Sequence, residues 1–104
     1  MTQVKNSGHN YAAQIVKKLA ADDVLSIAES VGVKIVYEKW FPITYGEFDK
    51  KKKTISVNLC AGESQIKIIA HELGHFFAQE MNLSEIEEEV FAHGFADYLT
   101  KDKK

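Results

Sequence analysis

Apolar positions in the first third of the chain follow a helical period. From Tyr11 to Val31 they recur every three or four residues, which predicts either one long helix or two consecutive helices. Asp22 and Asp23 are residues of the type that begins helices, so a bend is expected near Ala20. The pattern leaves the choice between one helix and two open.

Three shorter segments have the composition of strands. They are rich in β-branched and aromatic residues and run from Val33 to Trp40, from Thr44 to Phe48 and from Thr54 to Leu59. The polar stretch from Asp49 to Lys53 is short enough to join the last two as an antiparallel hairpin. We therefore expect a three-stranded, mostly antiparallel sheet.

Two more helices follow the predicted strands. Ser64 is a suitable N-cap for a helix from about Gln65 to Met81. Ser84 and Glu87 have capping-box spacing, which predicts a last helix that runs to about Thr100. The order of helix, strands, helix and helix indicates an α+β fold.

Size and charge narrow the possible functions. With 104 residues, 45% of them hydrophobic, the chain fits a single domain over residues 1–104. A net charge of −2 provides no basic field for nucleic acid. Cys60 is the single cysteine, so no internal disulfide forms and a cytoplasmic location is expected. The first ten residues are polar and no apolar run is long enough to cross a bilayer, so neither a signal peptide nor a membrane partner is expected.

Residues 71–75 form a candidate metal-binding motif. They read His-Glu-Leu-Gly-His, the HExxH motif, within the predicted helix from Gln65. Side chains four residues apart lie one above the other on a helix, so His71 and His75 are both able to reach one metal ion. This motif is typical of zinc peptidases, and it makes Zn²⁺ the expected cofactor.

A catalytic zinc ion takes three protein ligands and leaves one position open. The last helix offers Glu85, Glu87, Glu88 and Glu89 as the third ligand. The presence of Glu87 is explained by its role in the helix cap. The helical phase favours Glu89 as the third ligand, and Glu85 and Glu88 stay open as alternatives. Glu89 shares its face with Ile86, Ala92, His93 and Ala96, a stripe of small and apolar groups suited to close packing against another helix.

The remaining roles follow from the chemistry of peptide hydrolysis. Glu72 would accept a proton from a zinc-bound water and pass it to the leaving amine. His93 would either orient a ligand by a hydrogen bond or simply pack, and it is not expected as a fourth ligand, which would close a catalytic site. Tyr45 and Tyr98 are candidate donors to the oxyanion of the transition state.

With these residues in place, the chain resembles the ImmA/IrrE family of small zinc metallopeptidases and, more broadly, the minimal gluzincin (minigluzincin) scaffold. The resemblance covers most of the chain, and its specific part is the HExxH helix. The segments that carry it are residues 27–33, 53–58, 70–76 and 89–96.

The resemblance implies a set of roles. His71 and His75 would be zinc ligands, Glu72 the general base and Glu89 the third ligand on a so-called glutamate helix. It also implies that a strand, here the one from Thr54 to Asn58, borders the cleft and pairs with an extended substrate. The substrate would be a protein, with a helix-turn-helix transcriptional repressor as the class that the family suggests.

The chain departs from the family pattern at two places. His93 stands where the family commonly has Asn, and Tyr98 begins a segment that replaces the usual Leu-Leu-Met-Pro ending. Beside a zinc endopeptidase, the alternative function is a latent or non-catalytic zinc-binding regulatory module. For a latent enzyme, a terminal segment would lie across the cleft, either the one from Met1 to Asn10 or the one from Lys101 to Lys104.

Overall fold

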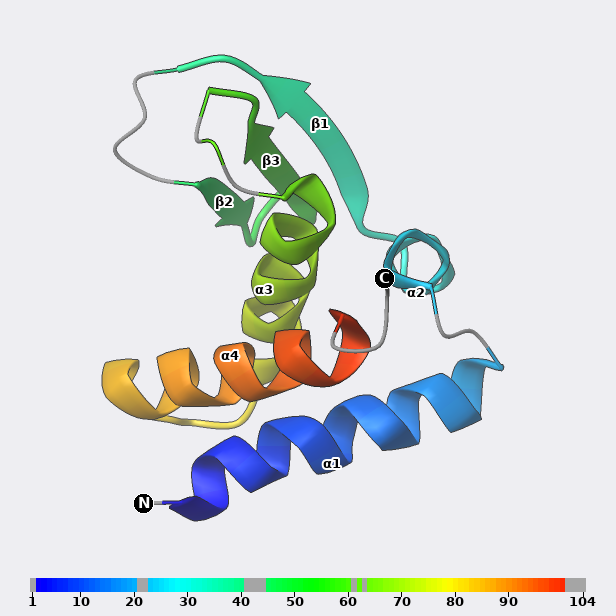
Figure 1. Cartoon of the computed structure of the whole chain (residues 1–104), viewed down its shortest axis with the longest axis vertical. Coiled ribbons are helices and arrows are strands. Elements are labelled where there is room, and N and C mark those ends of the chain that lie inside the picture. Colours follow the sequence, from blue (N-terminus) through cyan, green and yellow to red (C-terminus); the bar gives the residue numbers. More distant parts are fainter. Residues whose placement is uncertain (1, 21–22, 41–44, 61, 63, 101–104) are drawn as a thin grey trace.

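Helices and strands segregate into two parts of the molecule (Figure 1), which confirms the predicted α+β class. The computed structural model describes residues 2–20, 23–40, 45–60, 62 and 64–100, and for residues 2–6 it describes the backbone alone. The elements along the described chain are α1 (Thr2–Leu19), α2 (Val24–Ser30), β1 (Lys34–Glu38), β2 (Gly46–Asp49), β3 (Thr54–Asn58), α3 (Gln65–Ala78) and α4 (Glu85–Thr100).

The N-terminal helical region consists of two helices, separated at the predicted bend. Ala20 has a positive φ of 53° and follows the last residue of α1. Asp23 caps α2, since its side chain accepts a hydrogen bond of 3.1 Å from the backbone N–H of Ser26. The other candidate cap, Asp22, lies outside the described residues. Helix α1 begins well before Tyr11, because its first half packs against α4.

The sheet is mixed, with the strand order β1-β3-β2. Strands β2 and β3 form the predicted antiparallel hairpin. Strand β1, however, pairs with β3 in parallel, with Lys34 opposite Thr54 and Glu38 opposite Asn58. The expectation of a mostly antiparallel sheet therefore holds for one of the two pairings. Thr44, the predicted start of the second strand, lies outside the described residues.

The buried side chain of Asn58 explains why β1 lies beside β3. Its Oδ1 accepts hydrogen bonds from the backbone N–H groups of Trp40 at 3.3 Å and Cys60 at 2.9 Å. The N–H of Leu59 donates to the carbonyl of Glu38 at 2.8 Å. These bonds hold the chain that leaves β1 against the end of β3, so β3 becomes the central strand.

Both later helices begin where the sequence predicts. The Ser64 side chain accepts a hydrogen bond of 3.3 Å from the N–H of Lys67. Ser84 and Glu87 form the capping box, with the N–H of Glu87 donating to Ser84 Oγ at 3.1 Å and the N–H of Ser84 donating to Glu87 Oε1 at 3.0 Å. Helix α3 ends at Ala78, ahead of the predicted Met81, because a turn closed by a Met81 N–H to Ala78 carbonyl bond follows.

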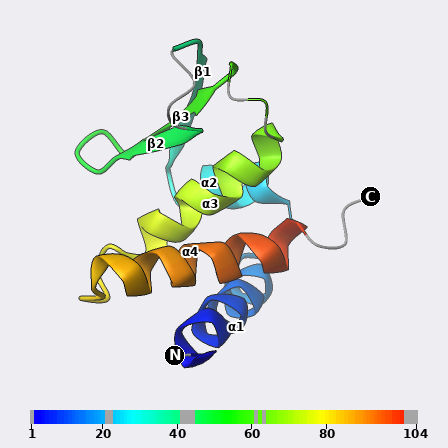
Figure 2. The same cartoon turned by 60° about the vertical axis from the view of Figure 1, so that its left-hand side comes forward.

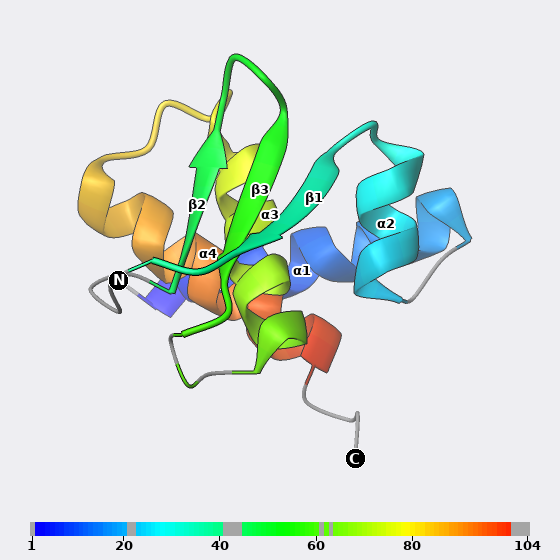
Figure 3. The same cartoon turned by 90° about the horizontal axis from the view of Figure 1, so that it is seen from above.

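Helix α3 lies between the sheet and α4, and α4 lies between α3 and α1 (Figures 1 and 3). The same order is visible from the side in Figure 2. None of the described helices combines the length and apolarity that a membrane span requires. The core between these layers includes Ile55, Val57, Ile69, Leu73, Phe91 and Phe95, all of which are fully buried or nearly so.

Two glycines let α4 approach its neighbours closely. A Cβ at Gly74 on α3 would lie 2.7 Å from the Cα of Ala92 on α4, which is closer than real Cβ contacts allow. On the other side of α4, a Cβ at Gly8 on α1 would clash with the carbonyl oxygen of Phe91 and the backbone nitrogen of Phe95. The backbones of α3 and α1 therefore both approach the backbone of α4 closely, from opposite sides.

We expect Gly74→Ala to destabilise the protein by about 1–3 kcal/mol, because the added methyl group meets backbone that can move only if α4 moves. Alanine is the better helix former by about 1 kcal/mol, so a loss of stability reports the contact and not the propensity. The measurement is urea denaturation followed by circular dichroism. Equal or higher stability of the variant would contradict the close approach of α3 and α4.

Candidate metal centre

The side chains of His71, His75 and Glu89 meet between α3 and α4. The Nε2 atom of His71 lies 3.2 Å from Nε2 of His75 and 3.2 Å from Oε1 of Glu89. The Nε2 atom of His75 lies 3.0 Å from Oε2 of Glu89. The structure thus brings both histidines of the HExxH motif and the preferred third ligand to one point.

The local sequence explains this convergence. His71 and His75 lie one turn apart on α3, so their rings point to the same side of the helix. Leu73 and Gly74 between them are buried and fix the face that α3 turns toward its neighbours. The capping box at the start of α4 sets where that helix begins, and Glu89 lies in its second turn.

Glu88 fixes the orientation of the His75 ring. Its Oε2 lies 2.6 Å from Nδ1 of His75, and an ionised carboxylate only accepts hydrogen bonds, so Nδ1 carries the proton. In the neutral ring, Nε2 then presents its lone pair toward Glu89 and His71. Such a carboxylate partner is the usual support of a metal-binding histidine.

Burial also prepares His71 to bind a cation. Burial lowers the pKa of the His71 imidazole, and the neighbouring His75 lowers it further, while the Glu89 carboxylate raises it. The lowered pKa favours the neutral ring, which is the form that binds a metal. Two imidazole nitrogens and a carboxylate therefore face one another, which is a donor set that a cation would stabilise.

The donor set fits zinc. Two imidazoles and one carboxylate are a common catalytic zinc set, and bonds of about 2.0–2.2 Å in a tetrahedral site place neighbouring donors roughly 3.3–3.6 Å apart. The three donor separations of 3.0–3.2 Å are slightly shorter than these edges. Small side-chain movements would thus accommodate the ion.

A second set of donors overlaps with the first. One donor atom each from His71, Glu89 and His93 lies within 4.8 Å of the other two. The Nε2 atom of His93 is 3.9 Å from Oε1 of Glu89, and the side chain is 68% exposed. We favour the set with His75 as the primary site because its separations are shorter and its ring is oriented by Glu88.

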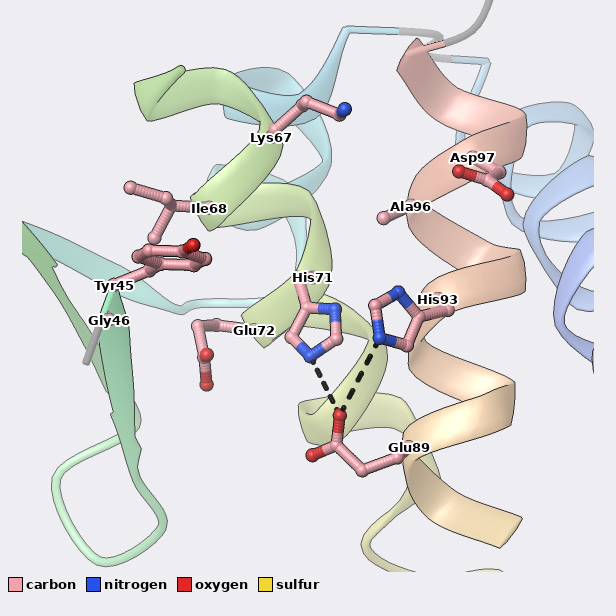
Figure 4. Close-up of a pocket in the computed structure, with 10 residues that line it drawn as sticks. All are labelled: Tyr45, Gly46, Lys67, Ile68, His71, Glu72, Glu89, His93, Ala96 and Asp97. Carbon is pink, nitrogen blue, oxygen red and sulfur yellow. Dashed lines mark ion pairs between the residues drawn. The ribbon is translucent and has the colours of Figure 1, made fainter. Parts of the chain in front are cut away.

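Glu72 lines a cleft of about 370 Å³ together with His71 and Glu89, two of the three candidate ligands (Figure 4). Burial raises the pKa of Glu72 to about 7; His75 lowers it, and the carboxylates of Glu89, Glu47 and Glu88 raise it. A carboxyl group with this pKa is able to take up and release a proton near neutral pH. The cleft is lined by Tyr45, Gly46, Lys67, Ile68, His71, Glu72, Glu89, His93, Ala96 and Asp97.

The strand that borders the cleft is β2 and not the expected strand from Thr54 to Asn58. Tyr45 and Gly46, at the start of β2, line the cleft. Strand β3 is central in the sheet and is paired on both sides, so its backbone has no free edge to offer a substrate. The expectation was wrong because the order of the strands depends on the long-range pairing of β1.

The two candidate oxyanion donors lie in different places. Tyr45 is 58% exposed and its ring lies in the cleft beside Ile68 (Figure 4). The Tyr98 ring lies 6.3 Å from that of His9, on the side of α4 that contacts α1. Of the two, Tyr45 is the one that lines the cleft.

Two other expectations for α4 need correction. Ile86 was placed on the face of Glu89 that packs against another helix, but it is 78% exposed. The role of Glu88 as partner of His75 was missed, although Glu88 lies one turn before the buried Ala92 and so faces α3. Glu85, the other alternative ligand, is exposed at the start of α4.

The N-terminal segment does not lie across the cleft. Residues 2–10 form the first half of α1, and Gly8 packs against α4 on the side away from α3 (Figure 1). The C-terminal segment 101–104 and Met1 lie outside the described residues. Terminal inhibition from the N-terminal side, which was one way to a latent enzyme, therefore has no support in this fold.

Known proteins offer no direct guide to this site. No family model, curated protein or solved structure matches the chain. The resemblance to the ImmA/IrrE peptidases rests on the residues quoted for it, and a proposal of function has to rest on the chemistry of the cleft.

We expect Glu88→Ala to weaken zinc binding by roughly 10- to 100-fold, the usual effect of removing the partner of a metal-bound histidine. The measurement is competition with a chromogenic chelator. Glu85→Ala is the matched control, since it removes the same charge from the exposed side of the same helix. Equal affinities of the two variants would show that Glu88 does not support His75.

We expect Glu72→Gln to stabilise the metal-free protein in a pH-dependent way. The pKa of Glu72 is about 7 when folded against an ordinary value of 4.5, so below pH 4.5 both states hold the proton and the variant gains nothing. As pH rises from 4.5 to 7, the unfolded wild type has lost its proton while the folded wild type still holds it, so the wild type loses stability relative to the variant. The difference should reach on the order of 3 kcal/mol above pH 7.

The measurement is urea denaturation of both proteins in the presence of a chelator between pH 5 and pH 8. A difference in the free energy of unfolding that stays constant over this range would contradict the buried environment of Glu72.

Proposed function

We propose that the protein is a zinc-dependent endopeptidase that hydrolyses peptide bonds of a protein substrate. The observation that carries the proposal is the meeting of His71, His75 and Glu89 within 3.2 Å of one another, with the partly buried Glu72 in the cleft that His71 and Glu89 also line. Three protein donors and one acid–base group are the components that metal-assisted hydrolysis requires.

Each residue has a separate part in the reaction. His71, His75 and Glu89 would hold the ion, and Glu88 would keep the His75 ring in position. Zinc, when bound, supplies a Lewis acid that polarises the scissile carbonyl and acidifies the attacking water. Glu72 would take the proton from that water and deliver it to the leaving amine, which is the role of a general base and then a general acid.

The free edge of β2 supports a peptide as the substrate. Strand β2 lies at the edge of the described sheet, and Gly46 at its start lines the cleft next to Glu72. A Cβ at Gly46 would lie 2.6 Å from Cγ2 of Ile68 and 3.0 Å from the carbonyl oxygen of Ser56, so the strand needs glycine to pass this close to α3. An extended peptide that pairs with β2 would place its backbone beside the metal-binding residues.

We propose a helix-turn-helix repressor as the class of substrate and the cytoplasm as the compartment. A helix-turn-helix repressor is the substrate that the ImmA/IrrE resemblance suggests, and the edge of β2 would accept any chain that adopts an extended conformation. Cys60 is free and exposed, which fits the reducing conditions of the cytoplasm.

A zinc-binding regulatory module is the second candidate function. The observation that favours it is the surplus of donors around the centre, since His93 also has a donor atom within 4.8 Å of those of His71 and Glu89. Against it stands Glu72, because a purely structural zinc site needs no acid–base group in the cleft.

We expect Glu72→Gln to lower kcat for peptide hydrolysis by roughly 10²- to 10⁴-fold, because glutamine cannot accept the proton. The assay incubates a randomised peptide library with the zinc-loaded protein and detects new termini by mass spectrometry. Zinc content should stay at the wild-type level, since Glu72 does not belong to the donor triangle.

Glu29→Gln, which makes the same change on the exposed face of α2, is the control and should cleave like the wild type. Full proteolysis by Glu72→Gln would exclude the general-base role. A zinc-loaded wild type that cleaves no peptide would favour the regulatory module.

A further inference from the structure

His93 occupies an unusual position for a surface histidine. It lies one turn after Glu89 on α4, its side chain is 68% exposed, and it lines the cleft together with Glu72. Its ring centroid is 4.6 Å from that of His71, and the two planes are inclined by 69° (Figure 4). The exposure excludes the packing role that the sequence left open, and Glu88 already orients His75.

The position of His93 adds a further donor beside His71 and Glu89. The Nε2 atom of His93 is 3.9 Å from Oε1 of Glu89, and donor atoms of His71, Glu89 and His93 all lie within 4.8 Å of one another. His75 and Glu89 approach to 3.0 Å on the other side of the same centre. Four donors close a tetrahedral zinc site, whereas catalysis needs one of the four positions for water.

We propose that His93 is a fourth protein ligand of the metal centre, so that the resting site is closed and becomes competent when His93 withdraws. The inference rests on the proposed function for the other three donors. It adds a latent state that is built into α4 itself, without a terminal segment over the cleft.

The four donor side chains differ in how strongly their surroundings constrain them. His93 is the least constrained and is therefore the one that would leave the metal. His71 and His75 project from α3, in which residues before and after each of them are buried. The Oε2 atom of Glu88 lies 2.6 Å from Nδ1 of His75 and fixes the orientation of that ring. The side chain of His93 is mostly surrounded by solvent, and its nearest approach to Glu89 is the longest of the ion-pair distances at the centre. A rotation about its side-chain bonds therefore costs little packing and exchanges the imidazole for water.

The point at which His93 would bind lies across His71 from Glu72. Figure 4 shows the Glu72 carboxyl group on the β2 side of His71 and the His93 ring on the α4 side. The position that His93 leaves would therefore lie on the α4 side of the centre, away from β2.

The test compares the full-length wild type with His93→Asn and with Glu85→Ala as the matched control on the exposed side of α4. X-ray absorption at the zinc edge counts the imidazole ligands of the zinc-loaded proteins. Chelator competition measures zinc affinity. Titration of the cobalt-loaded proteins with azide, followed by visible absorption, reports whether a coordination position is open to an external ligand.

We expect three imidazole ligands in the wild type and in Glu85→Ala, and two in His93→Asn. The zinc affinity of His93→Asn should fall at least about tenfold. Loss of a residue that only supports a ligand by a hydrogen bond already costs roughly tenfold. Azide should change the cobalt spectrum of His93→Asn at concentrations at least tenfold below those needed for the wild type.

Equal imidazole counts and equal azide titrations in the wild type and His93→Asn would overturn the inference and leave the three-donor centre intact. A lower kcat of His93→Asn with an unchanged imidazole count would also overturn it, and would assign His93 to substrate binding. His71→Ala provides the separate check on the centre. If it binds zinc as tightly as the wild type, the proposed function fails together with the inference.

Discussion

The close approach of α3 and α4 at Gly74 and Ala92 is the constraint on which the centre depends. His71 and His75 come from one helix and Glu88 and Glu89 from the other, so the donors meet only if the helix backbones are nearly in contact. Gly74 lies inside the HExxH motif, between Glu72 and His75. In the proposed function, one pentapeptide would thus supply two metal donors, the acid–base group and the close approach that lets the third donor reach them.

The same principle applies on the outer side of α4. Gly8 lets α1 approach the backbone at Phe91 and Phe95, so α4 cannot move away from α3 without clashing with the backbone of α1. The aromatic side chains of α4 extend from this layer into the core, where the rings of Tyr11, Phe77 and Phe95 lie 5–7 Å apart. The first half of α1, which looks too polar for a buried helix, is therefore a structural support of the centre.

Local signals in the sequence predicted much of this fold. Asp23, Ser64 and the pair Ser84 and Glu87 begin their helices as expected, because a cap depends on residues three positions apart. The position of β1 beside β3 and the role of Glu88 were not predicted, since each depends on residues far apart in the chain. His71, His75 and Glu89 were predicted because helical phase carries information about which side chains share a face.

The centre also has a thermodynamic cost that the ion would offset. In the metal-free protein, ring nitrogens of His71 and His75 crowd against the Glu89 carboxylate, and Glu72 is partly buried nearby. A domain of 104 residues has limited core to compensate for this, so metal binding and folding should be coupled. An exposed fourth donor adds affinity for the ion without adding another buried polar group, which is a physical reason for α4 to present a histidine at position 93.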